Sequence, residues 1–147
     1  MVPRLYIDTN IFITLVESSP SDSLRGVMDL IESGRALAFT SDLTIAELLV
    51  HPYADGDDAR ADAYIAMIST SELMRVAPVD RETLIRAARL RSLRRSLKLP
   101  DAIHVATAEL ADCGIFLSND GDVGLREPMR RVGLDEDDLQ ALIAFLA

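Results

Sequence analysis

Apolar residues along this chain fall into short runs and into longer segments with helical spacing. The short runs are bounded by turn residues, a pattern typical of β-strands. We expect four strands, at residues 4–7, 36–40, 73–76 and 115–118. In the longer segments apolar positions recur every three or four residues, which predicts amphipathic helices. These segments lie at about 10–17, 23–33, 43–51, 59–69, 81–97, 101–112 and 136–146.

Prolines set the expected ends of two of these helices. Pro52 and Pro100 should each end the preceding helix, because proline lacks the backbone N–H that a helix interior needs. Residues 122–131 show no strong pattern, and we expect helical turns there. Residues 131–134 are a weak candidate for a fifth strand.

The alternation of short strands with helices predicts an α/β fold with a mainly parallel central sheet of four to five strands. Helices should cover both faces of this sheet. The length of 147 residues suits one domain spanning residues 1–147. Right-handed crossovers would bring the C-terminal ends of all strands to one edge, where ligands of α/β proteins usually bind.

Composition narrows the classes of function. The net charge of −9 argues against a protein that coats nucleic acid, because such proteins are basic. It leaves room for a nuclease whose site is itself acidic. No apolar run is long enough for a membrane helix, so we expect no membrane partner. Cys113 is the only cysteine, so no internal disulfide can form, which favours a reducing cytoplasmic location.

Four acidic residues stand where the predicted strands end or the predicted helices begin: Asp8, Glu47, Asp101 and Asp120. The topology above would place Asp8 and Asp120 on the C-terminal edge of the sheet. Glu47 and Asp101 would reach this edge from the first turns of helices. Carboxylate oxygens are the ligands that hard divalent cations prefer. The pattern therefore predicts a site for one or two Mg²⁺ or Mn²⁺ ions, and phosphodiester chemistry with it.

Each acid also has a purely structural interpretation. Asp8 is well placed to cap the following helix. Thr44 and Glu47 have the spacing of a capping box. Asp101 sits in a first helical turn, where a negative charge is stabilising, and residues 118–122 form a polar turn by composition. These interpretations leave unexplained why four carboxylates should meet at one sheet edge.

The chain resembles the PIN-domain ribonucleases, and most closely the VapC-like toxins of bacterial type II toxin–antitoxin pairs. The resemblance covers nearly the whole chain. Each motif is weak alone, but their order and spacing together are specific. The motifs are Tyr6–Asn10, Ser41–Glu47, Leu99–Ala108 and Phe116–Asp120.

This resemblance implies a three-layer α/β/α fold and cleavage of RNA that depends on Mg²⁺ or Mn²⁺. It also implies a homodimer and a small antitoxin partner with a DNA-binding head. Carried over by position, the acidic quartet is Asp8, Glu47, Asp101 and Asp120. Asp122 is an alternative to Asp120 as the last acid, because family members vary in this turn.

Several further residues are candidates for supporting roles. Asn10 and Ser118 could orient a ligating carboxylate or a water molecule through hydrogen bonds. His104 follows Asp101 by three residues and so shares its helical face. We interpret His104 as a packed, hydrogen-bonded histidine rather than a general base.

The predicted helix at 81–97 carries most of the positive charge, and Arg86, Arg89 and Arg94 are candidates for contacts to RNA phosphates. A solvated helix face explains the same arginines equally well. Two alternatives to a toxin also stay open at this point. One is a catalytically inactive PIN-like binding module, and the other is a housekeeping PIN nuclease without an antitoxin.

Overall fold

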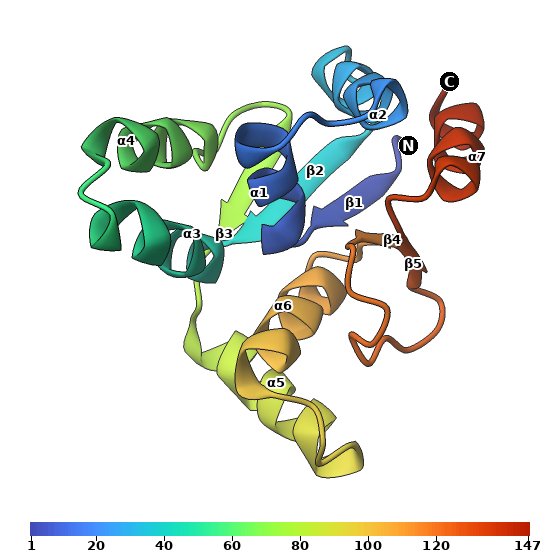
Figure 1. Cartoon of the computed structure of the whole chain (residues 1–147). Helices are drawn as coiled ribbons and strands as arrows, with labels where there is room; N and C mark the ends of the chain where they lie inside the picture. Colours follow the sequence, from blue (N-terminus) through green and yellow to red (C-terminus); the bar gives the residue numbers. More distant parts are fainter.

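A five-stranded parallel β-sheet runs through the middle of the molecule in the computed structural model, which describes residues 1–147 (Figure 1). The order of its strands is β3-β2-β1-β4-β5, and all four pairings are parallel. The sheet confirms the predicted fold class. The strands are β1 (Arg4–Ile7), β2 (Leu37–Ser41), β3 (Met74–Ala77), β4 (Ile115–Leu117) and β5 (Arg130–Val132).

Seven helices cover the two faces of the sheet, which gives three layers (Figure 1). Helices α5 and α6 pack together on one face, and α1, α2, α7 and the α3–α4 pair lie toward the other. The helices are α1 (Thr9–Glu17), α2 (Asp22–Glu32), α3 (Asp42–Ala54), α4 (Asp58–Met67), α5 (Arg81–Leu93), α6 (Leu99–Leu110) and α7 (Glu136–Leu146).

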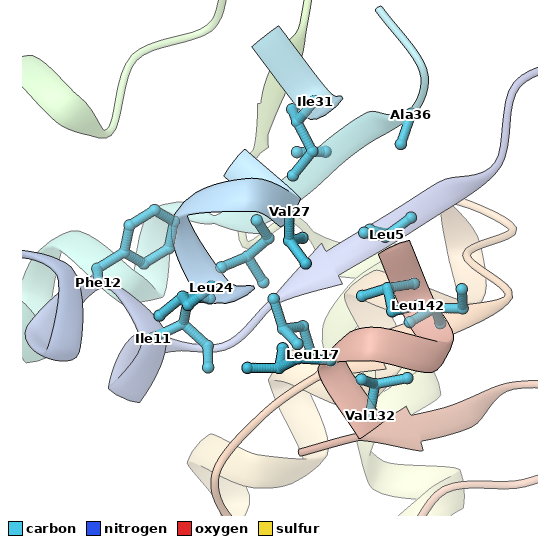
Figure 2. Close-up of a cluster of buried hydrophobic side chains, with 14 of the residues drawn as sticks. Leu5, Ile11, Phe12, Leu24, Val27, Ile31, Ala36, Leu117, Val132 and Leu142 are labelled. Atoms are coloured by element: carbon cyan, nitrogen blue, oxygen red, sulfur yellow. The ribbon is translucent and has the colours of Figure 1, made fainter. Parts of the chain in front are cut away.

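Alternation along the central strands divides the core into two apolar layers. Leu5 and Leu117 belong to the cluster beneath α1, α2 and α7 (Figure 2). Tyr6 and Phe116 belong to the cluster beneath α5 and α6, and their rings stack with centroids 4.9 Å apart. Successive side chains of a strand point to opposite faces. Both faces of β1 and β4 are therefore buried, which holds the ends of these two strands in fixed positions.

The structure corrects several predicted boundaries. Helix α3 continues through Pro52 to Ala54, because the proline lies in the last turn and removes only one hydrogen bond there. Helix α5 ends at Leu93 rather than at residue 97. Helix α6 begins at Leu99, with Pro100 inside its first turn, where the missing N–H costs nothing.

The segment between β4 and α7 was also partly mispredicted. Residues 122–129 form turns and irregular backbone rather than helical turns. The weak fifth-strand candidate is confirmed as β5, which pairs with β4 in the register Leu117 to Val132. A strand of three residues gives little periodic pattern in the sequence, which explains why it was hard to predict.

Two further findings concern the helices and the single cysteine. No helix has the length and apolar character needed to cross a membrane. Cys113 is buried, and this burial raises the pKa of its thiol to about 12. The thiol therefore stays protonated at neutral pH and acts as a small apolar residue rather than as a nucleophile.

Candidate active site

The candidate site lies at the C-terminal ends of β1 and β4, where the order of the sheet changes direction. The chain proceeds from β1 to β2 and β3 on one side and to β4 and β5 on the other. Such a switch point leaves a crevice at the C-terminal ends of the strands, because the flanking connections diverge there. Asp8 directly follows β1, and Ser118 directly follows β4.

Asp8 is nearly buried and is held by neighbours from both strands. Its Oδ1 accepts a hydrogen bond of 2.9 Å from Thr9 N, which makes it the N-cap of α1. Its Oδ2 accepts a bond of 2.7 Å from Ser118 Oγ and a longer one of 3.4 Å from Asn10 Nδ2. The capping interpretation is thus correct, but one carboxylate oxygen also faces the end of β4.

Asn10 and Ser118 tie the turn after β4 to the start of α1. Asn10 Nδ2 donates to Ser118 Oγ at 3.2 Å, and Asn10 Oδ1 accepts from Asn119 N at 3.0 Å. Ser118 Oγ also accepts from Asp120 N at 3.0 Å. These bonds fix the turn that carries Asp120 beside Asp8, which is the arrangement expected of groups that orient site carboxylates.

Asp101 reaches the same edge from the first turn of α6. Burial raises the pKa of Asp101, and the negative charges of Asp120, Asp8 and Glu47 raise it further. Like charges disfavour one another's ionised forms only when they lie close together. The structure therefore brings all four predicted acids into one electrostatic cluster.

Glu47 does not form the capping box that its spacing suggested. The N-cap of α3 is Ser41, whose Oγ accepts from Leu43 N at 3.0 Å. Glu47 Oε1 instead accepts from Thr9 Oγ1 at 2.7 Å and lies 2.5 Å from His104 Nε2. Burial favours a higher pKa for Glu47, but these two partners outweigh it and hold the pKa below its usual value. The side chain is thus directed toward the site.

Sequence reasoning missed two residues around Glu47, Thr9 and Tyr6, and did not connect His104 with Glu47. Thr9 contacts Glu47 directly, His104 bonds to it, and the hydroxyl of Tyr6 lies 2.5 Å from His104 Nδ1. The packed, hydrogen-bonded interpretation of His104 is confirmed, since only 2% of its surface is exposed. The spacing of three between Asp101 and His104 was the available signal, because it placed the histidine on the helical face that carries an acid.

Asp122 differs from the other acids in its partners. It is exposed and forms an ion pair with Arg94. Its backbone N–H donates to Asp120 Oδ1 at 3.0 Å. Asp122 is not among the charges that raise the pKa of Asp101, whereas Asp120 is the first of them.

The predicted basic residues are placed unequally around the site. Arg94 and Lys98 line a pocket of about 200 Å³ together with Asp101, Asp120 and Asp122. Arg86 is paired with Glu109 at 3.1 Å, and Arg89 forms no salt bridge. Of the three candidate arginines, only Arg94 lies in the pocket that the acids line.

The residues present fit a hard divalent cation, although they form no ready-made cage. No group of three His, Cys, Asp or Glu side chains is arranged around a common metal position. Mg²⁺ usually takes only one or two protein carboxylates and keeps several waters. Burial and the neighbouring carboxylates raise the pKa of Asp101, and the oxygen-only donor set suits this class of ion.

Comparison with known families identifies the chain. The PIN domain family matches residues 5–128, and the chain therefore belongs to the PIN domain family. This match spans β1, the acidic cluster and the turn after β4. No curated protein matches the sequence significantly.

Solved structures with the same fold include several toxin–antitoxin proteins. A DNA-bound VapBC complex from Salmonella typhimurium has a TM-score of 0.71 and 18% identity, covering 92% of this chain and 100% of that one. A toxin–antitoxin complex from Klebsiella pneumoniae has a TM-score of 0.61 and 22% identity, covering 84% of this chain and 92% of that one. VapC20 from Mycobacterium tuberculosis, a toxin that cleaves the sarcin-ricin loop, has a TM-score of 0.63 and 18% identity, covering 81% and 92%. At these identities the likeness establishes the three-layer PIN-like fold.

Proposed function

We propose that this PIN-domain protein is a metal-dependent endoribonuclease and the toxin of a type II toxin–antitoxin pair. The observation that carries the proposal is the electrostatic cluster of four carboxylates at the switch point of the sheet. A purely structural role would leave these acids separately capped or solvated. Instead, three of them raise the pKa of the fourth, an arrangement that a bound cation would stabilise.

The four acids would have different roles because they lie at different positions in the site. Asp8, Asp101 and Asp120 would supply carboxylate oxygens to one or two Mg²⁺ or Mn²⁺ ions. When bound, such an ion lowers the pKa of a water molecule and polarises the scissile phosphate. Glu47 would orient the attacking water or add a further ligand. Its lowered pKa keeps it ionised, so that its oxygens can accept a hydrogen bond from that water.

Asn10 and Ser118 keep Asp8 in place while the substrate binds. Asp8 Oδ2 accepts hydrogen bonds from Ser118, which follows β4, and from Asn10 in the first turn of α1, so the carboxylate cannot rotate freely. A carboxylate that is already oriented loses little conformational freedom when it binds a cation. In the proposed reaction the water attacks the phosphorus atom and releases a proton to solvent. The phosphorus–oxygen bond of the RNA backbone breaks, and the departing oxygen takes a proton from solvent.

Basic residues at the rim of the pocket would receive the RNA backbone. Arg94 and Lys98 stand beside the acids, and Arg89 is free to contact a phosphate farther along α5. Arg86 is the weaker candidate, because it pairs with Glu109 and does not line the pocket that contains the acids. Phosphate contacts of this kind position a nucleic acid without reading its sequence.

The toxin role and the partners rest on family resemblance and on the structural neighbours. The antitoxin would be a small protein with a DNA-binding head and a tail that covers the acidic edge. The fold is shared with toxin–antitoxin complexes from Klebsiella pneumoniae and Salmonella typhimurium, and with a toxin that cleaves the sarcin-ricin loop. We also propose a homodimer that acts in the cytoplasm, where Cys113 stays a free thiol.

Induced expression in a bacterial host tests the toxin role. Wild type should arrest growth and leave discrete fragments in total cellular RNA, whereas Asp8→Asn at equal soluble levels should do neither. Normal growth with wild type, together with RNA cleavage by the purified protein, would favour a housekeeping nuclease. Normal growth without cleavage would favour a catalytically inactive binding module.

A further inference from the structure

Two buried side chains, Tyr6 and His104, form a hydrogen-bonded row that extends from the interior of the sheet to Glu47. Tyr6 on β1 is fully buried, and the 2% exposure of His104 on α6 leaves that ring almost fully enclosed. The Tyr6 hydroxyl lies 2.5 Å from His104 Nδ1, and His104 Nε2 lies 2.5 Å from Glu47 Oε1. None of the roles proposed above for the acidic cluster uses Tyr6 or His104. These two residues therefore need a separate explanation.

The direction of the hydrogen bonds follows from the donors that each group carries. An ionised carboxylate can only accept, so His104 Nε2 must carry a hydrogen and donate it to Glu47. In the tautomer that carries its hydrogen on Nε2 alone, Nδ1 is the acceptor of the bond from the Tyr6 hydroxyl. The Tyr6 ring is itself held in place by stacking on Phe116. It also packs edge-on against the ring of His104, with the two ring centroids 5.8 Å apart.

Glu47 receives its second hydrogen bond on the same oxygen. Thr9 Oγ1 donates to Oε1 at 2.7 Å, and neither bond involves Oε2. About one third of the Glu47 side chain is exposed, and a glutamate on a helix surface would otherwise sample several rotamers. Two donors on one oxygen restrict the carboxylate to one orientation and leave Oε2 available.

We propose that His104 is a positioning residue that, with Tyr6 behind it, fixes the carboxylate of Glu47 for its part in RNA cleavage. This inference rests on the proposed nuclease function. His104 touches neither the RNA nor the reacting atoms and acts through Glu47. Its Nε2 also stands 4.0 Å from Asp8 Oδ1, so the ring lies next to two acids of the cluster. The contact joins α3 to α6 across the site, and no shorter link between Glu47 and α6 is present.

Substitutions of His104 separate positioning from packing. In His104→Gln the amide nitrogen can take the place of Nε2 and donate to Glu47, whereas His104→Leu fills similar space without a donor. Thr107→Val is the matched control, because Thr107 is also buried on α6 but its hydroxyl bonds only to the Ile103 carbonyl. Tyr6→Phe keeps the ring and removes the donor to Nδ1.

Cleavage of a defined RNA by each purified variant, with saturating Mg²⁺, gives kcat and KM separately. Loss of a residue that orients a site carboxylate typically costs about 10–100-fold, and His104→Leu should lose kcat in this range with KM nearly unchanged. His104→Gln should recover most of the loss, Tyr6→Phe should fall between them, and Thr107→Val should match wild type. Wild-type kcat in His104→Leu, or an equal loss in Thr107→Val, would overturn the inference.

Crystal structures of wild type and His104→Leu test the positioning independently of catalysis. The Glu47 carboxylate should leave its wild-type position in the leucine variant and keep it in His104→Gln. If wild type cleaves no RNA, the proposed nuclease function fails, and these structures alone decide the positioning. Glu47 unmoved in His104→Leu would then contradict it. If the leucine variant does not fold, His104→Gln and Tyr6→Phe carry the same comparison.

Discussion

Ser118 and Asp8 lie 110 residues apart in the chain, yet Ser118 Oγ donates a hydrogen bond of 2.7 Å to Asp8 Oδ2. The contact exists because β1 and β4 are neighbours in the sheet, paired in the register Ile7 to Leu117. The residue after each strand then emerges at the same edge. One pairing of strands therefore gives the first acid of the cluster a fixed orientation and brings Asp120 beside it.

The last acid of the cluster should be Asp120 rather than Asp122. Asp120 acts electrostatically on Asp101, whereas Asp122 is neutralised by Arg94. Asp120→Asn should lower RNA cleavage on the order of 100-fold, because it removes a charged ligand from the cluster. Asp122→Asn should lower it less than about threefold, since an exposed ion pair contributes little. Cleavage rates of the two purified variants decide this, and a greater loss in Asp122→Asn would reverse the assignment.

Removing one charge from the acidic cluster should stabilise the metal-free protein. Asp101 has a raised pKa in the fold, so the native state binds its proton more tightly than the unfolded chain. Protonated Asp101 therefore adds stability to the fold at low pH. This stability is lost as the pH rises from the ordinary carboxyl pKa through the raised pKa of Asp101. At pH 7 Asp101→Asn should gain roughly 0.5–1 kcal/mol in the free energy of unfolding, a usual gain when a strained functional group is replaced.

Thermal unfolding with EDTA at pH 7 and at pH 3 measures this gain. The difference between Asp101→Asn and wild type should be present at pH 7 and small at pH 3, where the wild-type carboxyl is protonated. Added Mg²⁺ should raise the melting temperature of wild type more than that of the variant, because only a ligand that binds the native state stabilises it. A wild type more stable than the variant at pH 7 without metal would contradict the like-charge cluster.

The opposite pH dependence should hold for Glu109, on the far end of α6. Burial acts to raise the pKa of Glu109, but hydrogen bonds and charge from Arg126 and Arg86 outweigh burial and lower it below the ordinary 4.5. Ionised Glu109 therefore stabilises the folded state at pH values above its ordinary pKa. This stabilisation is lost as the pH falls through its lowered pKa in the fold.

Glu109→Gln should therefore destabilise the fold by about 1–2 kcal/mol at pH 7, since charge-assisted bonds to a half-buried acid are worth this much. The loss should fade below about pH 4. Urea unfolding at pH 7 and below about pH 4 measures the loss of stability. Glu32→Gln is the control, because Glu32 is an exposed acid without an ion pair. Equal stability of wild type and Glu109→Gln at pH 7 would exclude this role.

Helix α7 should be an integral part of the core rather than an appendage. Leu139 is fully buried against the layer that contains β5 and α2. Leu139→Ala should cost about 2–5 kcal/mol of unfolding free energy through lost burial and the cavity left behind. Phe145 on the same helix is 57% exposed, and Phe145→Ala should cost less than about 1 kcal/mol. Similar losses in urea unfolding for both variants would contradict this packing.

The sequence predicted the positions of Asp8, Asp101 and Asp120 because strand ends and helix starts are local features. Glu47 was expected in the first turn of a helix, but α3 begins earlier, at Asp42, and places it in the second turn. Topology then followed from general rules of parallel sheets, which place Asp8 and the turn after β4 on one edge. The approach of Glu47 and Asp101 to that edge depended on helix placement. It was supported by the resemblance to PIN-domain proteins rather than by spacing alone.

Residues that act through long-range contacts were harder to predict. The Tyr6–His104–Glu47 chain joins residues up to 98 positions apart, and no local spacing encodes it. The capping-box pattern at Thr44 and Glu47 was misleading for a related reason. Ser41 caps α3 instead, and the hydroxyl of Thr44 pairs with Thr40 at 2.8 Å inside the core.

Metal-dependent RNA cleavage that requires Asp8 is the central claim, and one assay tests it most directly. Purified wild type and Asp8→Asn are each incubated with total cellular RNA, with Mg²⁺ or Mn²⁺ and with EDTA. Thermal unfolding confirms that both proteins are folded. We predict discrete RNA fragments only for wild type with metal, and no fragments for Asp8→Asn or with EDTA. Equal cleavage by Asp8→Asn, or cleavage by wild type in EDTA, would contradict the claim.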